Sequence, residues 1–222
     1  MLFVILLTLK VATVATAVIV VPSTLLGYVL ARYDFRGREV LSAIVGLPLV
    51  LPPTAVGFLL LRLLATDGPL GRDTLGFDLN LLLTWKAAVI AAAVMSMPLI
   101  VRTARVTFEG IDPRLEMMAR TLGYGRLKTF VFFSLQLARR GLLAGTILGF
   151  TRALGEFGAT VIIAGNIPGR SQTLASAIFS AQQVGDDRQA YVLMIVAIVM
   201  GFGAIMTAEL LSRGGSLYGP TR

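Results

Sequence analysis

The sequence VATVATAVIVVPSTLLGYVLA at Val11–Ala31 continues for 21 residues without a charged side chain. An α-helix needs about 20 apolar residues to cross the hydrocarbon core of a bilayer. In lipid, every backbone polar group needs a partner within the protein, and a helix supplies these partners internally. This stretch therefore predicts a membrane-spanning helix.

Four further stretches have the same apolar character and a sufficient length, and they cover residues 40–65, 81–101, 141–165 and 190–211. Strands of a membrane barrel would be about 10 residues long and would alternate in polarity, unlike these stretches. We expect an all-α integral membrane protein with about five transmembrane helices in a single domain, residues 1–222. Prolines inside the spans are expected to kink or interrupt helices; they are Pro22, Pro48, Pro52, Pro53 and Pro98.

The composition of the whole chain agrees with a membrane location. Of its 222 residues, 56% are hydrophobic and 14% are charged, and the mean hydropathy is +0.82, whereas a soluble domain has about 25% charged residues. The chain has no cysteine and no histidine, which excludes zinc sites built on them, thiol nucleophiles and histidine acid–base chemistry. It also lacks the nucleotide-binding pattern G-x-x-x-x-G-K-[ST]. We therefore expect no metal and no cofactor on this chain.

Basic residues are concentrated in segments that lie on one side of the predicted spans. Thirteen of them are Arg32, Arg36, Arg38, Arg102, Arg105, Arg114, Arg120, Arg126, Lys128, Arg139, Arg140, Arg213 and Arg222, whereas the opposite side has Lys10, Arg72, Arg170 and Arg188. The positive-inside rule places the larger group in the cytosol. This predicts an external N-terminus and an internal C-terminus. The net charge of +8 then reflects membrane topology, and we expect no nucleic-acid partner.

The segment 102–140 between the third and fourth spans is too long for a plain connection. Asp112 is a suitable N-cap and Pro113 suits the first helical position. Gly123 is expected to end this helix, and a second helical stretch is predicted over 127–137. The sequence thus predicts a helix, a glycine turn and another helix exposed to the cytosol.

Leu115, Met118, Ala119 and Leu122 occur at helical spacing and form one apolar stripe on this first helix. Two interpretations are open from the residues alone. The stripe lies on the membrane or packs on the protein's own spans, or it docks into a groove on a cytosolic partner.

The sequence LEMMARTLG at 115–123 resembles the EAA loop of ABC importer permeases. The pattern of that loop is E-A-A, three residues, Gly, nine residues and I-x-L-P, and Ala119 and Gly123 match it at the right spacing. Phe133 and Leu135 fall at its I and L positions. The departures are Met117 at its Glu, with Glu116 one place earlier, Met118 at its first Ala, and Gln136 at its Pro.

Three other segments are similar to molybdate permeases of this family. They are LPLVLPPTAVG at 47–57, VMSMPL at 94–99 and RALGEFGAT at 152–160. The resemblance implies the type I ABC importer permease fold and a multi-pass location in the inner membrane, surrounded by lipids. It also implies that the substrate is a tetrahedral oxyanion, with molybdate as the first choice and sulfate or tungstate as alternatives.

The resemblance further implies the partners of the chain. They are a second copy of the chain, a cytosolic ABC ATPase that uses the ATP, and a periplasmic binding protein that delivers the oxyanion. The ATPase would contact the hairpin through Leu115, Glu116, Met118, Ala119, Arg120, Leu122 and Gly123.

Arg152 and Glu156 lie four residues apart within the predicted fourth span. A charge at the centre of a membrane helix costs about 2.5–3.5 kcal/mol, and an i, i+4 pair offsets part of that cost. One interpretation is a self-neutralising ion pair between packed helices. The other is a translocation path or gate formed by these two residues with Thr54, Gly155 and Gly158.

A hypothesis of a different class is a self-contained membrane enzyme acting on a lipid phosphate. Glu156 would be the base and Arg152 would bind the anion. One carboxylate without histidine, cysteine or metal ligands is a small catalytic set, and we therefore expect a transport subunit and not an enzyme.

Overall fold

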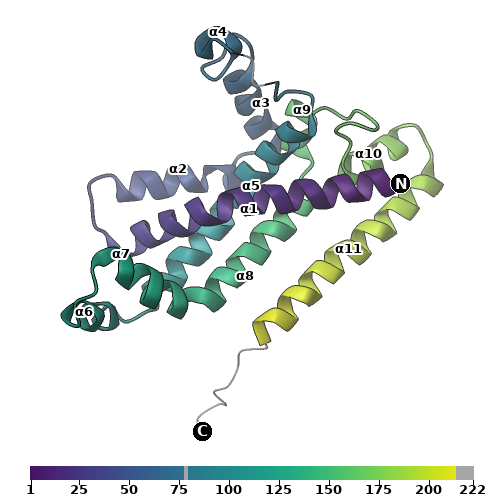
Figure 1. The fold of residues 1–222 in the computed structure, drawn as a ribbon. Helices are drawn as coiled ribbons and strands as arrows, with labels where there is room; N and C mark the ends of the chain where they lie inside the picture. The colour runs from purple at the N-terminus through teal and green to yellow at the C-terminus, as the bar shows by residue number, and fades with distance from the viewer. Residues whose placement is uncertain (78–79, 214–222) are drawn as a thin grey trace.

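The computed structural model describes residues 1–77 and 80–213, and every regular element within these ranges is helical (Figure 1). Arg222 and the end of the predicted domain lie outside the described residues. Four helices are long and apolar enough to cross a membrane: α1 (Leu2–Arg32), α5 (Trp85–Glu109), the continuous helix Arg126–Leu154, and α11 (Asp187–Arg213). A bent helix pair makes a possible fifth span. The expected all-α membrane architecture is confirmed.

Close packing of α1, α5 and α8 (Leu135–Leu154) forms the centre of the bundle. Small residues allow these helices to approach, since a Cβ added to Gly27 of α1 would lie 2.6 Å from the Cβ of Ala104 on α5. By contrast, α11 runs along the edge of the bundle, and only 6% of the residues in its most apolar stretch are buried. The face of α11 that points away from the bundle is therefore available to lipid.

The predicted span 40–65 is broken into α2 (Arg38–Val50) and α3 (Pro53–Leu64), which are bent by 114° relative to each other. Pro53 has no N–H for helix α2 to use, and its ring disfavours a helical conformation at Pro52. Pro52 accordingly has extended backbone, and Pro53 begins the next helix. The expected interruption by proline is confirmed here, whereas Pro22, Pro48 and Pro98 lie inside helices.

The fourth span also differs from its predicted bounds of 141–165. Its helix begins at Arg126, runs through α7 (Arg126–Thr129), the π-helical turn η1 (Phe130–Ser134) and α8, and ends at Leu154. Gly155 follows as the C-cap, and the short helix α9 (Gly158–Ile163) starts after a break. Arg152 and Glu156 therefore do not share one helix, because Glu156 lies in the break.

The predicted connection 102–140 is shorter in the structure, since α5 continues to Glu109 and the next long helix already starts at Arg126. Basic side chains reach water from helix ends through their long aliphatic stems, so they need no loop of their own. The third span likewise starts later than predicted, at Trp85, and the first starts earlier, at Leu2. The predicted orientation of the termini remains a prediction.

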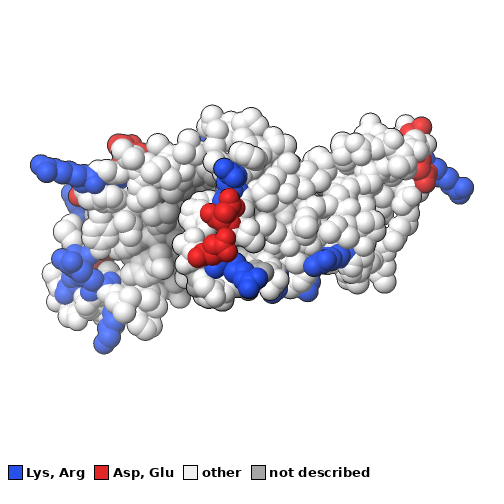
Figure 2. All heavy atoms as spheres, turned by 90° about the horizontal axis from the view of Figure 1, so that it is seen from above, with Lys and Arg blue, Asp and Glu red and all other residues white. Residues whose placement is uncertain are grey.

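The remaining helices are short and lie between the spans. They are α4 (Arg72–Leu75), α6 (Pro113–Thr121) and α10 (Leu174–Gln183). Figure 1 places α6 and α7 at one end of the bundle and α10 at the other end, beside the N-terminus. Figure 2 shows basic side chains gathered at the end where α6 and α7 lie, and a separate group of acidic and basic side chains near the middle of the view, where α4 lies.

Candidate functional site

The first candidate site is the α6 hairpin, which we define as residues 110–134. Asp112 caps α6 as predicted, because its Oδ1 accepts a hydrogen bond of 2.9 Å from the backbone N–H of Arg114. The turn after α6 contains Gly123 at φ +89°, a left-handed conformation that glycine adopts without steric cost. The predicted helix, glycine turn and second helix are thus confirmed.

The residues of the apolar stripe predicted on α6 do not all face the same way in the structure. Leu115, Met118 and Leu122 are exposed, with Leu122 at 75%, whereas Ala119 is buried at 2%. These three side chains therefore do not pack on the protein's own spans. Arg120 is also exposed, next to this surface.

Glu116 points inward and holds α6 to the rest of the molecule. Its Oε1 accepts a hydrogen bond of 3.1 Å from Nε of Arg32 and one of 2.8 Å from Oγ of Ser134. Nη2 of Arg32 also donates to the carbonyl of Ile111 at 2.9 Å. Sequence reasoning missed Arg32 and Ser134, because 84 residues separate Arg32 from Glu116.

An aromatic cluster lies beneath this ion pair and joins three helices. Tyr28 of α1 contacts Phe108 of α5 at a ring-centroid distance of 5.1 Å and Phe130 of η1 at 4.6 Å. Aromatic pairs at such distances stabilise a packed structure beyond their buried area. The base of the hairpin is therefore a packed unit, while the outer face of α6 is open.

The second candidate site is the junction where α3 and α9 begin. A Cβ on Gly57 would lie 2.9 Å from Cα of Ala159, and a Cβ on Gly158 would lie 2.7 Å from Cβ of Pro53. The two interrupted spans consequently meet at their breaks. Thr54 follows Pro53 and is exposed at this junction.

Arg152 and Glu156 form an ion pair next to the junction, with Nη1 and Oε2 2.7 Å apart. The Glu156 side chain is 2% exposed and that of Arg152 is 27% exposed. The other carboxylate oxygen of Glu156 accepts a hydrogen bond of 2.9 Å from the N–H of Ala159 in α9. Both oxygens thus have partners, and the guanidinium is the more accessible member of the pair.

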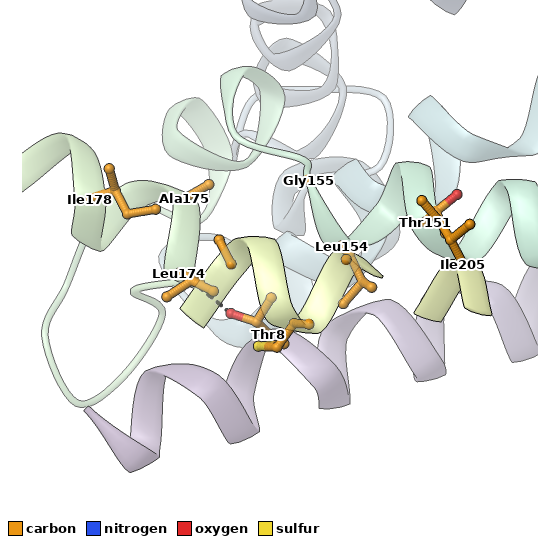
Figure 3. A pocket seen from close by; sticks show the side chains of 11 residues that line it. Thr8, Thr151, Leu154, Gly155, Leu174, Ala175, Ile178 and Ile205 are labelled. Carbon is orange, nitrogen blue, oxygen red and sulfur yellow. Dashed lines mark hydrogen bonds between the residues drawn. The ribbon is translucent and has the colours of Figure 1, made fainter. Parts of the chain in front are cut away.

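Gly155 faces a different region from Gly158. It lines a cavity of about 260 Å³ between α1, α8, α10 and α11 (Figure 3). Thr8 supplies a hydroxyl there, but this group donates to the carbonyl of Val4 and accepts from the N–H of Leu174, each at 2.8 Å. The cavity wall is otherwise mainly apolar, with Leu154 and Ile178 among its residues. Such a wall does not suit an oxyanion.

Apolar helices of membrane length, one bent span and a structured hairpin at one end define a multi-pass membrane protein. Residues 23–212 match the family described as binding-protein-dependent transport system inner membrane component. The chain belongs to this family, and it is a multi-pass protein of the inner membrane. It is accordingly a transport subunit and not a self-contained enzyme.

Two relatives and one solved structure illustrate the similarity. The chain is 40% identical over 211 residues to the molybdenum transport system permease protein ModB of Escherichia coli, covering 94% of this chain and 92% of ModB. It is 38% identical over 179 residues to the sulfate transport system permease protein CysT of Salmonella typhimurium, covering 81% of this chain and 65% of CysT.

The fold is also similar to a solved chain of a bacterial alginate ABC transporter in complex with an alginate pentasaccharide-bound periplasmic protein. The TM-score is 0.78 at 18% identity, covering 99% of this chain and 80% of the other. This likeness concerns the fold alone, and it agrees with the expected ABC importer permease fold.

Proposed function

We propose that this chain is the permease subunit of an ATP-driven importer that moves molybdate across the inner membrane. The observation that supports molybdate as the substrate is the 40% identity to a molybdenum permease over 94% of the chain. Sulfate is a second candidate, because a sulfate permease is 38% identical over 179 residues. Tungstate is the third anion to test, since it shares the tetrahedral shape and charge.

The complex would contain two copies of this chain, a separate cytosolic ATPase that hydrolyses ATP, and a periplasmic binding protein that presents the anion. The family description, a binding-protein-dependent transport system, supports the last of these partners. A protein with no nucleotide-binding loop of its own needs a separate source of ATP energy.

The α6 hairpin would transmit force from the ATPase. Its exposed side chains Leu115, Met118 and Leu122 offer an apolar helix face of the kind that inserts into a groove. Glu116 and Ala119 would hold α6 from the inside, Gly123 would form the turn, and Arg120 would lie at the edge of the contact. Coupling requires that this face bind the ATPase differently in the inward-open and outward-open states.

The junction of α3 and α9 would lie on the translocation path. The exposure of Thr54 and the accessible guanidinium of Arg152 support this placement. A guanidinium matches the geometry of an oxyanion and can bind it by two hydrogen bonds. Glu156 would hold that guanidinium, Gly158 would allow the two breaks to meet, and Gly155 would permit movement of α8 relative to α9.

The test compares two neighbouring exposed methionines in the reconstituted complex. Met118→Glu changes the proposed ATPase-binding face, whereas Met117→Glu places the same charge about 100° away around the helix. We expect Met118→Glu to reduce molybdate uptake and molybdate-dependent ATP hydrolysis about tenfold or more. A tenfold loss corresponds to about 1.4 kcal/mol of binding free energy between the permease and the ATPase, which is typical of an important interface residue. The control should retain both activities.

Uptake of molybdate, tungstate and sulfate by the unmodified complex then tests the substrate. Preferred uptake of sulfate would overturn the molybdate assignment, while leaving the proposed role of the hairpin intact. Equal activity of both methionine variants and the unmodified protein would instead overturn the role of α6.

A further inference from the structure

A continuous groove runs between α1 and α8 on the half of the bundle nearer the α6 hairpin. It consists of two neighbouring cavities of about 470 and 320 Å³, which share Val20 and Thr146 in their walls. The larger one is also lined by Ala204 of α11, and the smaller one by Arg139 of α8. We call this feature the α1–α8 groove.

The wall of the α1–α8 groove is mainly apolar, and three of its five threonines donate hydrogen bonds within their own helices. Oγ1 of Thr16 donates to the carbonyl of Ala12 and Oγ1 of Thr146 donates to that of Leu142, each at 2.8 Å. Thr207 likewise donates to the carbonyl of Gly203. These hydroxyl hydrogens are used within their own helices, so the groove suits hydrocarbon and not an oxyanion.

The part of the groove between Arg139 and Phe150 matches one leaflet of a bilayer. These two residues lie 11 positions apart on one continuous helix, which corresponds to about 17 Å at the rise of an α-helix. Half of a hydrocarbon core is about 15 Å thick. Along α1 the groove has a similar length, about 18 Å from Thr13 to Leu25. This part of the groove therefore fits an acyl chain, and the groove continues past Arg139 to Phe130.

A positive charge lies beside the smaller cavity, between Thr146 and the hairpin end of the groove at Phe130. Arg139 is exposed, and it forms no ion pair among residues 1–77 and 80–213. An unpaired guanidinium at the rim of an apolar groove complements a phosphate group attached to an acyl chain. The long aliphatic stem of Arg139 allows its guanidinium to reach the depth of lipid headgroups.

We propose that the α1–α8 groove binds one anionic phospholipid, with an acyl chain between α1, α8 and α11 and its phosphate on Arg139. This site is distinct from the proposed path at the α3–α9 junction. The bound acyl chain fills the space beside α11, a helix that buries little of its own surface. It thereby links the edge helix to the centre of the bundle.

The experiment uses the full chain reconstituted in phosphatidylcholine vesicles that contain a minor fraction of phosphatidylglycerol with a photoreactive acyl chain. After illumination, labelled peptides are identified by mass spectrometry. Ala17→Phe fills the groove, and Val18→Phe is its control, because Val18 is exposed on α1 and is not part of the groove wall. Arg139→Gln removes the charge, and Arg140→Gln is its control, because neighbouring Arg140 does not line the groove.

We expect labelling of α1 and α8 peptides in the unmodified chain and in both controls. Arg139→Gln should reduce this labelling about fivefold, which corresponds to about 1 kcal/mol for one basic residue at a membrane surface. Ala17→Phe should reduce it with photoreactive phosphatidylglycerol and with photoreactive phosphatidylcholine alike. The unmodified chain should prefer the anionic lipid.

Two results would overturn the proposal. Equal labelling of all variants, without preference for the anionic lipid, would indicate ordinary surrounding lipid. Loss of a dimer on Ala17→Phe, with unchanged lipid labelling, would indicate that a second copy of the chain occupies the groove.

Discussion

Two buried glutamates, Glu116 and Glu156, stabilise the two candidate sites by similar contacts. They differ in how far along the chain each glutamate lies from its arginine partner. Each carboxylate pairs with an arginine and accepts one further hydrogen bond, from Ser134 or from the N–H of Ala159. Arg152 is four residues from Glu156, whereas Arg32 is 84 residues from Glu116. The first pair fixes a local break, and the second attaches a whole hairpin to α1. Removal of Glu116 should therefore disturb far more of the molecule.

The largest effect is expected for Glu116→Ala. The change leaves Arg32, whose side chain is 11% exposed, without its carboxylate and removes the acceptor for Ser134. Breaking a buried pair typically costs about 3–5 kcal/mol. The expected result is detachment of α6, measured as faster tryptic cleavage after Arg114 and Arg120 in membranes, together with loss of ATPase coupling. Glu39→Ala is the control, because Glu39 is exposed and takes part in none of these contacts. Unchanged cleavage in Glu116→Ala would contradict the long-range attachment.

A smaller effect is expected at the break near Glu156, where two glycines differ in their surroundings. An added Cβ at Gly158 would lie 2.7 Å from Pro53, whereas at Gly155 its nearest neighbour would be the carbonyl oxygen of Thr151 at 4.0 Å. Gly158→Ala should destabilise the protein by about 1–3 kcal/mol through overpacking. Gly155→Ala should leave the thermal unfolding midpoint in detergent nearly unchanged. Equal midpoints for the two variants would show that α3 and α9 do not meet as described.

The sequence was sufficient for the features that depend on local chemistry. Apolar runs of membrane length predict the helices, and Asp112 with Gly123 predicts the start and end of α6, because caps and glycine turns involve residues close in the chain. The spacing of Arg152 and Glu156 allows an ion pair, and the contact is present. Its role on the path stays a prediction.

The sequence was insufficient where a backbone break or a distant contact decides the structure. The run 141–165 has no charged residue apart from Arg152 and Glu156 and is mainly apolar, so hydropathy gives no sign that the helix ends at Leu154. The break depends on the bond from Ala159 to Glu156 and on the contact of Gly158 with Pro53. The division of the α6 stripe has the same origin, because the direction in which Ala119 points depends on how α6 docks.

The smallest effect on stability is expected when both members of the local pair are neutralised. Glu156→Gln retains an oxygen that can accept from the N–H of Ala159, but it leaves the partly exposed Arg152 without its counter-charge. Each single change to Gln should lower the thermal unfolding midpoint, because the remaining charge loses its partner. The double variant should return to within about 1 kcal/mol of the unmodified protein, since it has no unpaired charge at this position.

Transport by the same three variants distinguishes a path residue from a structural pair. If the guanidinium of Arg152 contacts the oxyanion, then molybdate uptake will stay low in the double variant although its stability has returned. This is the result we expect, because Arg152 is the accessible member of the pair and Glu156 has both oxygens occupied within the protein. Recovery of uptake together with stability would limit the pair to holding α8 against α9, and the translocation path would then need another anion-binding group.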